Sequence, residues 1–276
     1  MKKIISVMLI AAAMLMLLAS CSQKTDWEYI GSKGTLKIGV TIFKPMNYKD
    51  ENNNWVGFET EFAQAVSEKL GVKAEFVEID WSKKVVELKS KAIDCVWNGM
   101  TVKEELKAEM DMSQSYMNNW QVVVIRKADA EKYTTLESMA GAKTVAESES
   151  AGESTIKANE GLAKNYTSVD SQVKALMEVK SGTADIAVVD YVMAKSSTGD
   201  GTDYSELQMV EGIEQFSYEE YAIGFRKNSP ETVKKVNDAI NALIADGTLN
   251  PISLMTDTQC LTYQIPGGML SNLLSQ

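Results

Sequence analysis

One stretch of the chain constrains its fold most: residues 94–104 predict a buried strand, then a loop, then a helix. Residues 94–97 form a short, mostly apolar run, which is typical of a strand in the core of a sheet. The Asn-Gly pair at 98–99 interrupts that run, and Thr101 with Glu104 matches a capping box that starts a helix. Ligands of open α/β sheets bind at such strand ends, and free N–H groups at a helix start attract anions. An ordinary strand-to-helix turn would have the same sequence pattern.

Strands and helices alternate along the chain, which predicts an α/β fold with mainly parallel sheets flanked by helices. Runs at 36–40 and 74–79 predict two strands before the central stretch, with an amphipathic helix between them. The same order recurs on a smaller scale between residues 143 and 190.

Two further strand-like runs, 121–126 and 218–226, enclose that smaller set. An inserted domain needs one connection out and one back, so these runs predict two lobes joined by two hinge strands. We place the first lobe at residues 35–123 and 225–276, and the inserted second lobe at 124–224. Lobes hinged in this way close around a ligand in the cleft between them.

The N-terminus carries an export signal. Two lysines precede an apolar run at 4–18, so residues 1–20 match a lipoprotein signal peptide. The Leu-Ala-Ser-Cys sequence after this run is similar to a bacterial lipobox, in which Cys21 is lipidated; the alternative is a plain signal peptide with a chance cysteine. We expect residues 21–34 to tether the lobes to the extracellular face of the cell membrane, because one lipid anchor holds a chain there without spanning it.

Charge and composition exclude several classes of function. A formal net charge of −10 argues against nucleic acid, which requires a basic face. The chain has no histidine, so neither a Ser-His-Asp triad nor a histidine-ligated metal site can form. We expect no metal and no cofactor. Cys95 and Cys260 could pair outside the cell, although the buried strand position of Cys95 favours a free core cysteine.

Five short motifs follow one another at characteristic spacing: Val-Gly-Phe-Glu-Thr-Glu at 56–61, Gly-x-Thr at 99–101, Ala-Val-Val-Asp at 187–190, Tyr-Ala-Ile-Gly-Phe-Arg-Lys at 221–227 and Ala-Asp-Gly-Thr at 245–248. In order and spacing they resemble the extracellular solute-binding proteins of amino-acid ABC transporters, in the polar amino-acid group. The resemblance covers residues 36 to about 252. It implies a two-lobed, type II periplasmic-binding-protein-like fold that binds a small-molecule amino acid.

The resemblance implies two aromatic side chains that clamp the ligand. Trp81 matches one position and Phe43 the other, with Tyr48 as the substitute for Phe43. A ring face attracts cations and covers alkyl stems. A core or surface aromatic is the alternative for each residue.

The resemblance also implies how the first lobe holds the two ends of an amino acid. The segment Asn98-Gly99-Met100 belongs to the site, with carbonyls of Asn98 and Met100 facing the α-ammonium. Thr101 offers its N–H and its hydroxyl to the α-carboxylate.

From the second lobe, Asp190 matches the aspartate that pairs with the ammonium. On the residues alone, an acid that closes an apolar strand could equally be a helix cap. Ser148, Ser150 and Gly152 match the small loop that closes on the carboxylate.

Two positions depart from the family pattern. Where the family has an arginine that grips the carboxylate, this chain has Leu106, and the nearby Lys103 and Lys107 lack a planar guanidinium. Glu149 stands where the family usually has a small residue. We therefore expect a cationic ligand or one without a free α-carboxylate, unless backbone N–H groups at Thr101 suffice.

We predict a lipid-anchored, monomeric solute-binding protein that delivers a polar, and by its charge cationic, amino acid or related amine to an ABC transporter permease. We expect no catalysis. An enzyme on the same fold, similar to a dehydratase, is one alternative and would need a positioned general acid, for which Glu149 and Asp190 are the candidates. A ligand-sensing module for a membrane receptor is the other.

Overall fold

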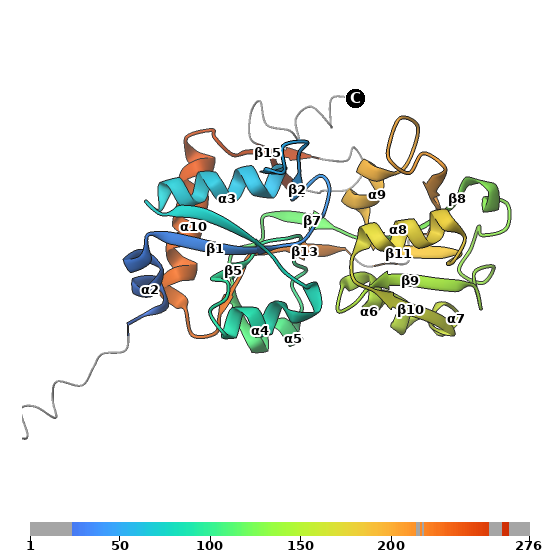
Figure 1. The fold of residues 1–276 in the computed structure, drawn as a ribbon, viewed down its shortest axis with the longest axis horizontal. Coiled ribbons are helices and arrows are strands. Elements are labelled where there is room, and N and C mark those ends of the chain that lie inside the picture. The colour runs from blue at the N-terminus through green and yellow to red at the C-terminus, as the bar shows by residue number, and fades with distance from the viewer. Residues whose placement is uncertain (1–23, 214–215, 217, 254–260, 265–276) are drawn as a thin grey trace, which may run out of the picture.

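The structure is a computed structural model that describes residues 24–213, 216, 218–253 and 261–264. These residues form two α/β lobes that lie side by side (Figure 1). Each lobe contains one five-stranded sheet. The predicted two-lobed architecture is present.

The sheet of the first lobe has the strand order β4 (Lys73–Glu78), β1 (Thr35–Val40), β5 (Cys95–Val96), β14 (Gly224–Arg226) and β6 (Met110–Met112). Apolar side chains cover both of its faces. Helices α3 (Phe58–Lys69) and α10 (Pro230–Ala245) pack on one face, and α4 (Lys84–Lys89) and α5 (Glu104–Glu109) lie on the other (Figure 1). A hairpin of β2 (Tyr48–Lys49) and β3 (Trp55–Val56) precedes α3, and the 3-10 turn η1 (Trp81–Lys83) precedes α4.

The sheet of the second lobe has the order β10 (Asn165–Val169), β9 (Lys143–Glu147), β11 (Ile186–Asp190), β8 (Gln121–Arg126) and β12 (Leu207–Met209). Side chains of β8 and β11 alternate between two apolar clusters, as a strand buried on both faces requires. The flanking helices are α6 (Ala151–Ala158), α7 (Glu160–Ala163), α8 (Gln172–Ser181) and α9 (Tyr191–Ser197), and the 3-10 turn η2 (Lys127–Asp129) follows β8.

Both sheets are mixed, and in each of them four of the five strands run in the same direction, as expected of mainly parallel sheets. In the first lobe β1 pairs parallel with β4 and β5, whereas β14 runs antiparallel to β5 and β6. In the second lobe β9 is parallel to β10 and β11, whereas β8 is antiparallel to β11 and β12. The antiparallel strands are those next to the crossings between the lobes.

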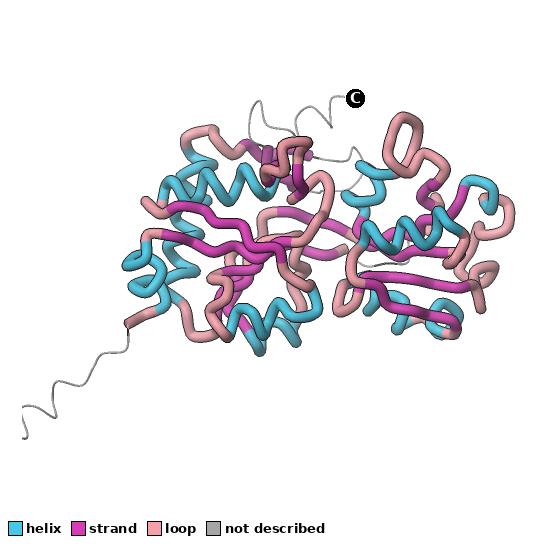
Figure 2. The backbone as a smooth tube through the Cα atoms, in the orientation of Figure 1, coloured by secondary structure: helices cyan, strands magenta, loops and turns pink. Residues whose placement is uncertain are grey.

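Two short strands occupy the region between the lobes: β7 (Met117–Asn119) and β13 (Glu219–Tyr221), which pair antiparallel (Figures 1 and 2). In the same four-stranded sheet lie β16 (Leu261–Gln264) and β15 (Asn250–Ser253). The run 121–126, predicted to cross between the lobes, lies wholly in the second sheet as β8. The outgoing crossing therefore comes earlier in the chain, at β7.

Residues 26–33 are not a tether, contrary to expectation. They form helix α2 (Asp26–Lys33), which starts with a capping box between Thr25 and Glu28. Ile30 is fully buried, and the Arg226 guanidinium joins Asp26 of α2 to Asp94 of the sheet. Helix α2 is thus part of the first lobe.

Several predictions concern residues that lie outside the described ones. These are the signal peptide, Cys21 and Cys260. Cys95 is a free, buried cysteine. Among the described residues, no helix combines the length and the apolar composition that a membrane crossing requires.

Candidate ligand-binding cleft

The two lobes meet around a small cavity between the start of α4 and the loop before α6. It encloses about 20 Å³, roughly the space of one water molecule. The first lobe lines it with Trp81, Lys84, Asn98, Gly99, Met100, Thr101, Lys103 and Leu106, and the second lobe with Glu147, Glu149, Ser150, Ala151, Gln172 and Asp190. Lys84 Nζ donates to the Glu149 carbonyl (3.2 Å) and Lys103 Nζ to the Ser150 carbonyl (3.3 Å), so hydrogen bonds hold the lobes together here. An amino acid can enter only if the lobes separate.

Buried contacts fix the backbone at Asn98 and Gly99. Gly99 has a φ of +57°, and its N–H donates to Oε1 of the buried Glu59 (2.8 Å). A side chain at Gly99 would meet the ring of Phe43 at 2.4 Å, so only glycine fits there. The Asn98 side-chain oxygen accepts a hydrogen bond from the Thr41 N–H (2.9 Å). The side-chain amide of Asn98 is therefore engaged within the first lobe and does not contact the ligand. Glu59, from the Gly-Phe-Glu motif, thus holds this segment in place.

Thr101 does not start a helix, contrary to the predicted capping box. Helix α5 begins at Glu104, and the Thr101 hydroxyl donates instead to Oε2 of Glu219 (3.0 Å). Thr101 forms a bridge with Tyr221 of β13. Its neighbours make the two backbone bonds of that bridge, Val102 N–H to the Glu220 carbonyl and Ala222 N–H to the Met100 carbonyl. The Thr101 N–H therefore points away from β13, while the Met100 carbonyl, expected to face an ammonium, already accepts one bond.

Asp190 ends strand β11 and is buried among side-chain amides. Its Oδ1 accepts from Asn119 Nδ2 (2.6 Å) and Gln121 Nε2 (2.7 Å), and Gln172 Nε2 donates to Oδ2. No lysine or arginine among the described residues lies within 4.0 Å of this carboxylate. Burial raises the pKa of Asp190. The amides orient the carboxylate but bring no positive charge.

Glu219 of the hinge strand β13 shares the amide donors of Asp190. Asn119 Nδ2 and Gln121 Nε2 lie 3.3 and 3.1 Å from its Oε2. Burial, and then the charge of Asp190, raises the pKa of Glu219 to about 7. The shared amide donors thus connect the hinge strand β13 to the end of β11.

Glu147, the last residue of β9, is a cavity-lining acid that the sequence analysis missed. It is 4% exposed, and its Oε1 has no hydrogen-bond partner among the described residues. Burial, and then the charge of Asp190, raises the pKa of Glu147 to about 8. Such a carboxyl can receive a donor or a cation from a group in the cavity.

The loop between β9 and α6 holds the other residues predicted from the second lobe. The Ser150 hydroxyl caps α6 by accepting from the Glu153 N–H (3.1 Å), and Ser150 lines the cavity. Glu149 also lines it, but with a φ of +59° its side chain is exposed. Ser148 and Gly152 do not line the cavity. Gly152 packs against β11, where a side chain would meet a backbone carbonyl at 2.5 Å.

Two lysines bring positive charge to the cavity. Lys84 is 3% exposed, with Nζ 4.6 Å from the centre of the Trp81 ring and 3.2 Å from the Trp81 carbonyl. Burial lowers the pKa of Lys84 to about 8. Lys103 Nζ donates to Ser154 Oγ (2.8 Å). Leu106, which replaces the arginine of the family pattern, also lines the cavity, so the two lysines bring positive charge to a place where that arginine is missing.

Only one of the predicted clamp aromatics reaches the cavity. Trp81 lines it, whereas Phe43 is 2% exposed and packs in the core of the first lobe. Tyr48, the substitute, lies in β2 and does not line the cavity.

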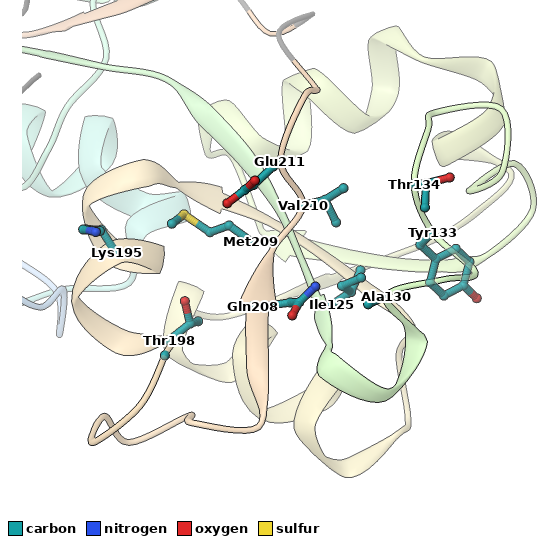
Figure 3. Close-up of a pocket in the computed structure, with 11 residues that line it drawn as sticks. Ile125, Ala130, Tyr133, Thr134, Lys195, Thr198, Gln208, Met209, Val210 and Glu211 are labelled. Carbon is teal, nitrogen blue, oxygen red and sulfur yellow. The ribbon is translucent and has the colours of Figure 1, made fainter. Parts of the chain in front are cut away.

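A larger hollow of about 490 Å³ lies on the second lobe, outside the cleft (Figure 3). Side chains from α9, β12 and the segment after β8 line it, among them Lys195, Glu211 and Tyr133. All of them belong to one lobe, and the buried acids and lysines of the cleft are absent from it. We therefore place the candidate site in the cleft. Among the described residues, no group of three His, Cys, Asp or Glu could hold a metal ion in either place.

The protein has two lobes, two strands that connect them, and buried charged groups in the closed cleft between them. This combination is typical of proteins that capture a small ligand by closing around it. Residues 36–254 match the family of bacterial extracellular solute-binding proteins, family 3. The match covers most of the chain, and the protein belongs to this family.

Individual relatives match over most of this chain. The L-cystine-binding protein TcyJ of Escherichia coli (strain K12) is 29% identical over 230 residues, 81% of this chain and 83% of that protein. The arginine-binding extracellular protein ArtP of Bacillus subtilis (strain 168) is 27% identical over 249 residues, 89% of this chain and 94% of that protein. An ABC uptake transporter substrate-binding protein from Streptococcus pneumoniae, solved with bound histidine, gives a TM-score of 0.75 at 28% identity, covering 82% and 93% of the two chains.

An enzyme also matches, over less of the chain. Cyclohexadienyl dehydratase of Pseudomonas aeruginosa is 25% identical over 191 residues, 67% of this chain and 71% of the enzyme. The relatives that match over more of the chain are binding proteins. The predicted type II fold, and the prediction of a binding protein rather than an enzyme, are confirmed.

Proposed function

We propose that the protein captures a polar amino acid in its cleft and delivers it, in the closed form, to the permease of an ABC importer. The observation that carries this proposal is Asp190: a carboxylate 6% exposed, oriented by three amides and paired with no lysine or arginine among the described residues. The α-ammonium group of an amino acid supplies the missing positive charge. A buried charge left unpaired is costly, and so a ligand cation gains much from this contact.

The relatives support an amino acid as the ligand, since their names give cystine and arginine and one of the structures holds histidine. All three ligands carry the α-ammonium and α-carboxylate groups that we assign to Asp190 and to the first lobe. Closure requires that the ligand bind the closed form better than the open one, which contacts to both lobes provide.

The test has two steps. Small molecules released from the denatured, purified protein are identified by mass spectrometry, and the amino acid found is titrated by calorimetry into wild type and Asp190→Asn. Removing one charge of a buried pair costs roughly 3–5 kcal/mol, so the dissociation constant should rise by about a hundredfold or more. Asp170→Asn is the control, because Asp170 lies in the same lobe with its side chain 88% exposed. A change below threefold for Asp190→Asn contradicts the role.

We propose further that cationic or neutral polar amino acids bind better than acidic ones. A second carboxylate on the ligand would lie in a poorly solvated cleft with Asp190, and like charges repel strongly there. A thermal-shift screen of the common amino acids and L-cystine measures the order directly. Tight, selective binding of glutamate or aspartate would contradict the charge argument.

We also propose that Cys21 is lipidated and holds the protein, as a monomer, at the extracellular face of the membrane. The Leu-Ala-Ser-Cys sequence after the apolar run supports this. Cys21→Ala should move the protein from the membrane fraction to the soluble fraction without changing its ligand affinity. A variant that stays in the membrane fraction after a salt wash would argue against the anchor.

A further inference from the structure

We propose that Lys84 binds the carboxylate group of the ligand, an inference that rests on the amino-acid-binding function proposed above. Lys84 is the first residue of α4, is 3% exposed and lines the cavity from the first lobe. In this role it selects ligands that carry a carboxylate over amines that do not.

In the part of the chain that the structure describes, the buried Lys84 ammonium has no counter-ion. No carboxylate among the described residues lies within 4.0 Å of its Nζ. Its neighbour Lys83 shows the ordinary arrangement, with a side chain 62% exposed and paired to Asp80 at 2.8 Å. Burial of an unpaired ammonium is unfavourable, so a lysine held in this way gains from any anion that enters the cavity. The pKa of Lys84, lowered by burial to about 8, still leaves most of the groups protonated at pH 7.

One of the three N–H donors of Lys84 is left over. Two are directed at carbonyl oxygens, that of Trp81 and that of Glu149, each 3.2 Å away. We find no third acceptor for Nζ among the described residues, and an ammonium has three donors. The carbonyl and ring of Trp81, which precedes Lys84 in the same lobe, hold the ammonium at the cavity, so these two contacts do not depend on the second lobe.

The charges of the two lobes also fit one orientation of an amino acid. Lys84 comes from the first lobe, whereas the buried acids Asp190 and Glu147 come from the second. An amino acid between them directs its ammonium to the second lobe and its carboxylate to the first. The other cavity lysine, Lys103, is half-buried, and its Nζ contacts Ser154 and the Ser150 carbonyl.

The experiment compares each amino acid with the amine that remains when its carboxyl group is removed: L-arginine with agmatine, L-histidine with histamine, and L-cystine with cystamine. The pair whose amino acid binds wild type best is titrated by calorimetry into wild type, Lys84→Met and Lys83→Met. Methionine keeps the length of the stem and removes the charge. We expect Lys84→Met to weaken the amino acid at least about 30-fold and the amine less than threefold, and Lys83→Met to change neither.

The alternative outcomes separate the proposals. If Lys84→Met weakens amino acid and amine equally, Lys84 only holds the lobes together through the Glu149 carbonyl, and the proposal is overturned. If Lys103→Met, and not Lys84→Met, removes the preference for the amino acid, the carboxylate binds to Lys103 instead. If no amino acid binds wild type, the proposed function itself fails. A melting temperature of Lys84→Met at or above that of wild type shows that the variant is folded.

Discussion

At the scale of single residues, burial decides which acids of the cleft can act on a ligand. Glu147 is 4% exposed, whereas the side chain of Glu149, two positions later, is exposed. Glu149 has a positive φ, and its backbone carbonyl accepts a hydrogen bond from Lys84 Nζ. The sequence singles out Glu149 because it departs from the family pattern, whereas Glu147 has the appearance of an ordinary strand end.

The two acids should therefore respond differently to neutralisation. Glu147→Gln should weaken the binding of a cationic amino acid by about tenfold or more, because a cation in the cavity favours the ionised form of Glu147 and glutamine cannot ionise. Glu149→Gln should change affinity less than threefold, because water already solvates that carboxylate. Calorimetric titration of both variants measures the difference. Equal effects would mean that Glu149 turns inward when the ligand binds.

The sequence could predict Trp81 at the cleft but could not place Phe43 or Lys84. Trp81 comes three residues after the end of β4, and the carboxyl ends of parallel strands meet at one edge of a sheet. The loop of Phe43 closes on itself, since its N–H and carbonyl both bond to Asn47, and this turns the ring into the core. Lysines in the first turn of a short helix usually face solvent, so nothing in the local pattern marks Lys84 as buried.

At the scale of elements, α2 is the clearest departure from the sequence-based expectation. Residues 26–33 are polar enough to suggest a tether, but one fully buried side chain, Ile30, and one buried ion pair make them part of the first lobe. A helix is recognised from apolar residues that repeat at helical spacing, and the eight residues of α2 bury only Ile30. The long helix α10 was predictable because five apolar positions repeat along one face.

Ile30→Ala should lower the free energy of unfolding by roughly 2–5 kcal/mol, the cost of emptying a fully buried aliphatic site. Urea denaturation of the mature protein, followed by tryptophan fluorescence, measures this. Ser32→Ala, on the outer face of the same helix, is the matched control and should change little. No effect of Ile30→Ala would show that α2 detaches in solution.

At the scale of the whole molecule, buried carboxyls make stability depend on pH. Burial raises the pKa of Glu59 and of Glu219 to about 7 and that of Glu147 to about 8. Because these folded-state values exceed the unfolded one, the stability they contribute is complete below about pH 4.5 and is lost as the pH rises through 7 to 8. The lowered pKa of Lys84 acts in the opposite sense, but only above about pH 8.

The free energy of unfolding should therefore be higher at pH 5.5 than at pH 8.0, by about a few kcal/mol, since each pKa unit corresponds to about 1.4 kcal/mol. Urea denaturation at both pH values checks this. Glu219→Gln should reduce the difference, because its amide oxygen still accepts the neighbouring donors while the ionisation is gone. Glu220→Gln, on the adjacent exposed position of β13, should leave the difference unchanged. A protein equally stable at the two pH values would contradict the raised pKa values.

The packing of α2 on the first lobe also limits the distance between that lobe and a membrane to which Cys21 is anchored. With Cys21 lipidated as proposed, three residues, 22–24, separate the lipid from Thr25, the N-cap of α2. From Cys21 to Thr25 the chain takes four residue steps, and each spans at most about 3.3–3.6 Å when extended, so the α2 N-cap can lie at most about 14 Å from Cys21. The domain then moves in a thin layer along the bilayer rather than through the medium, and its search for a permease becomes two-dimensional. Because Arg226 ties α2 to the first lobe, such an anchor would hold that lobe close to the lipid.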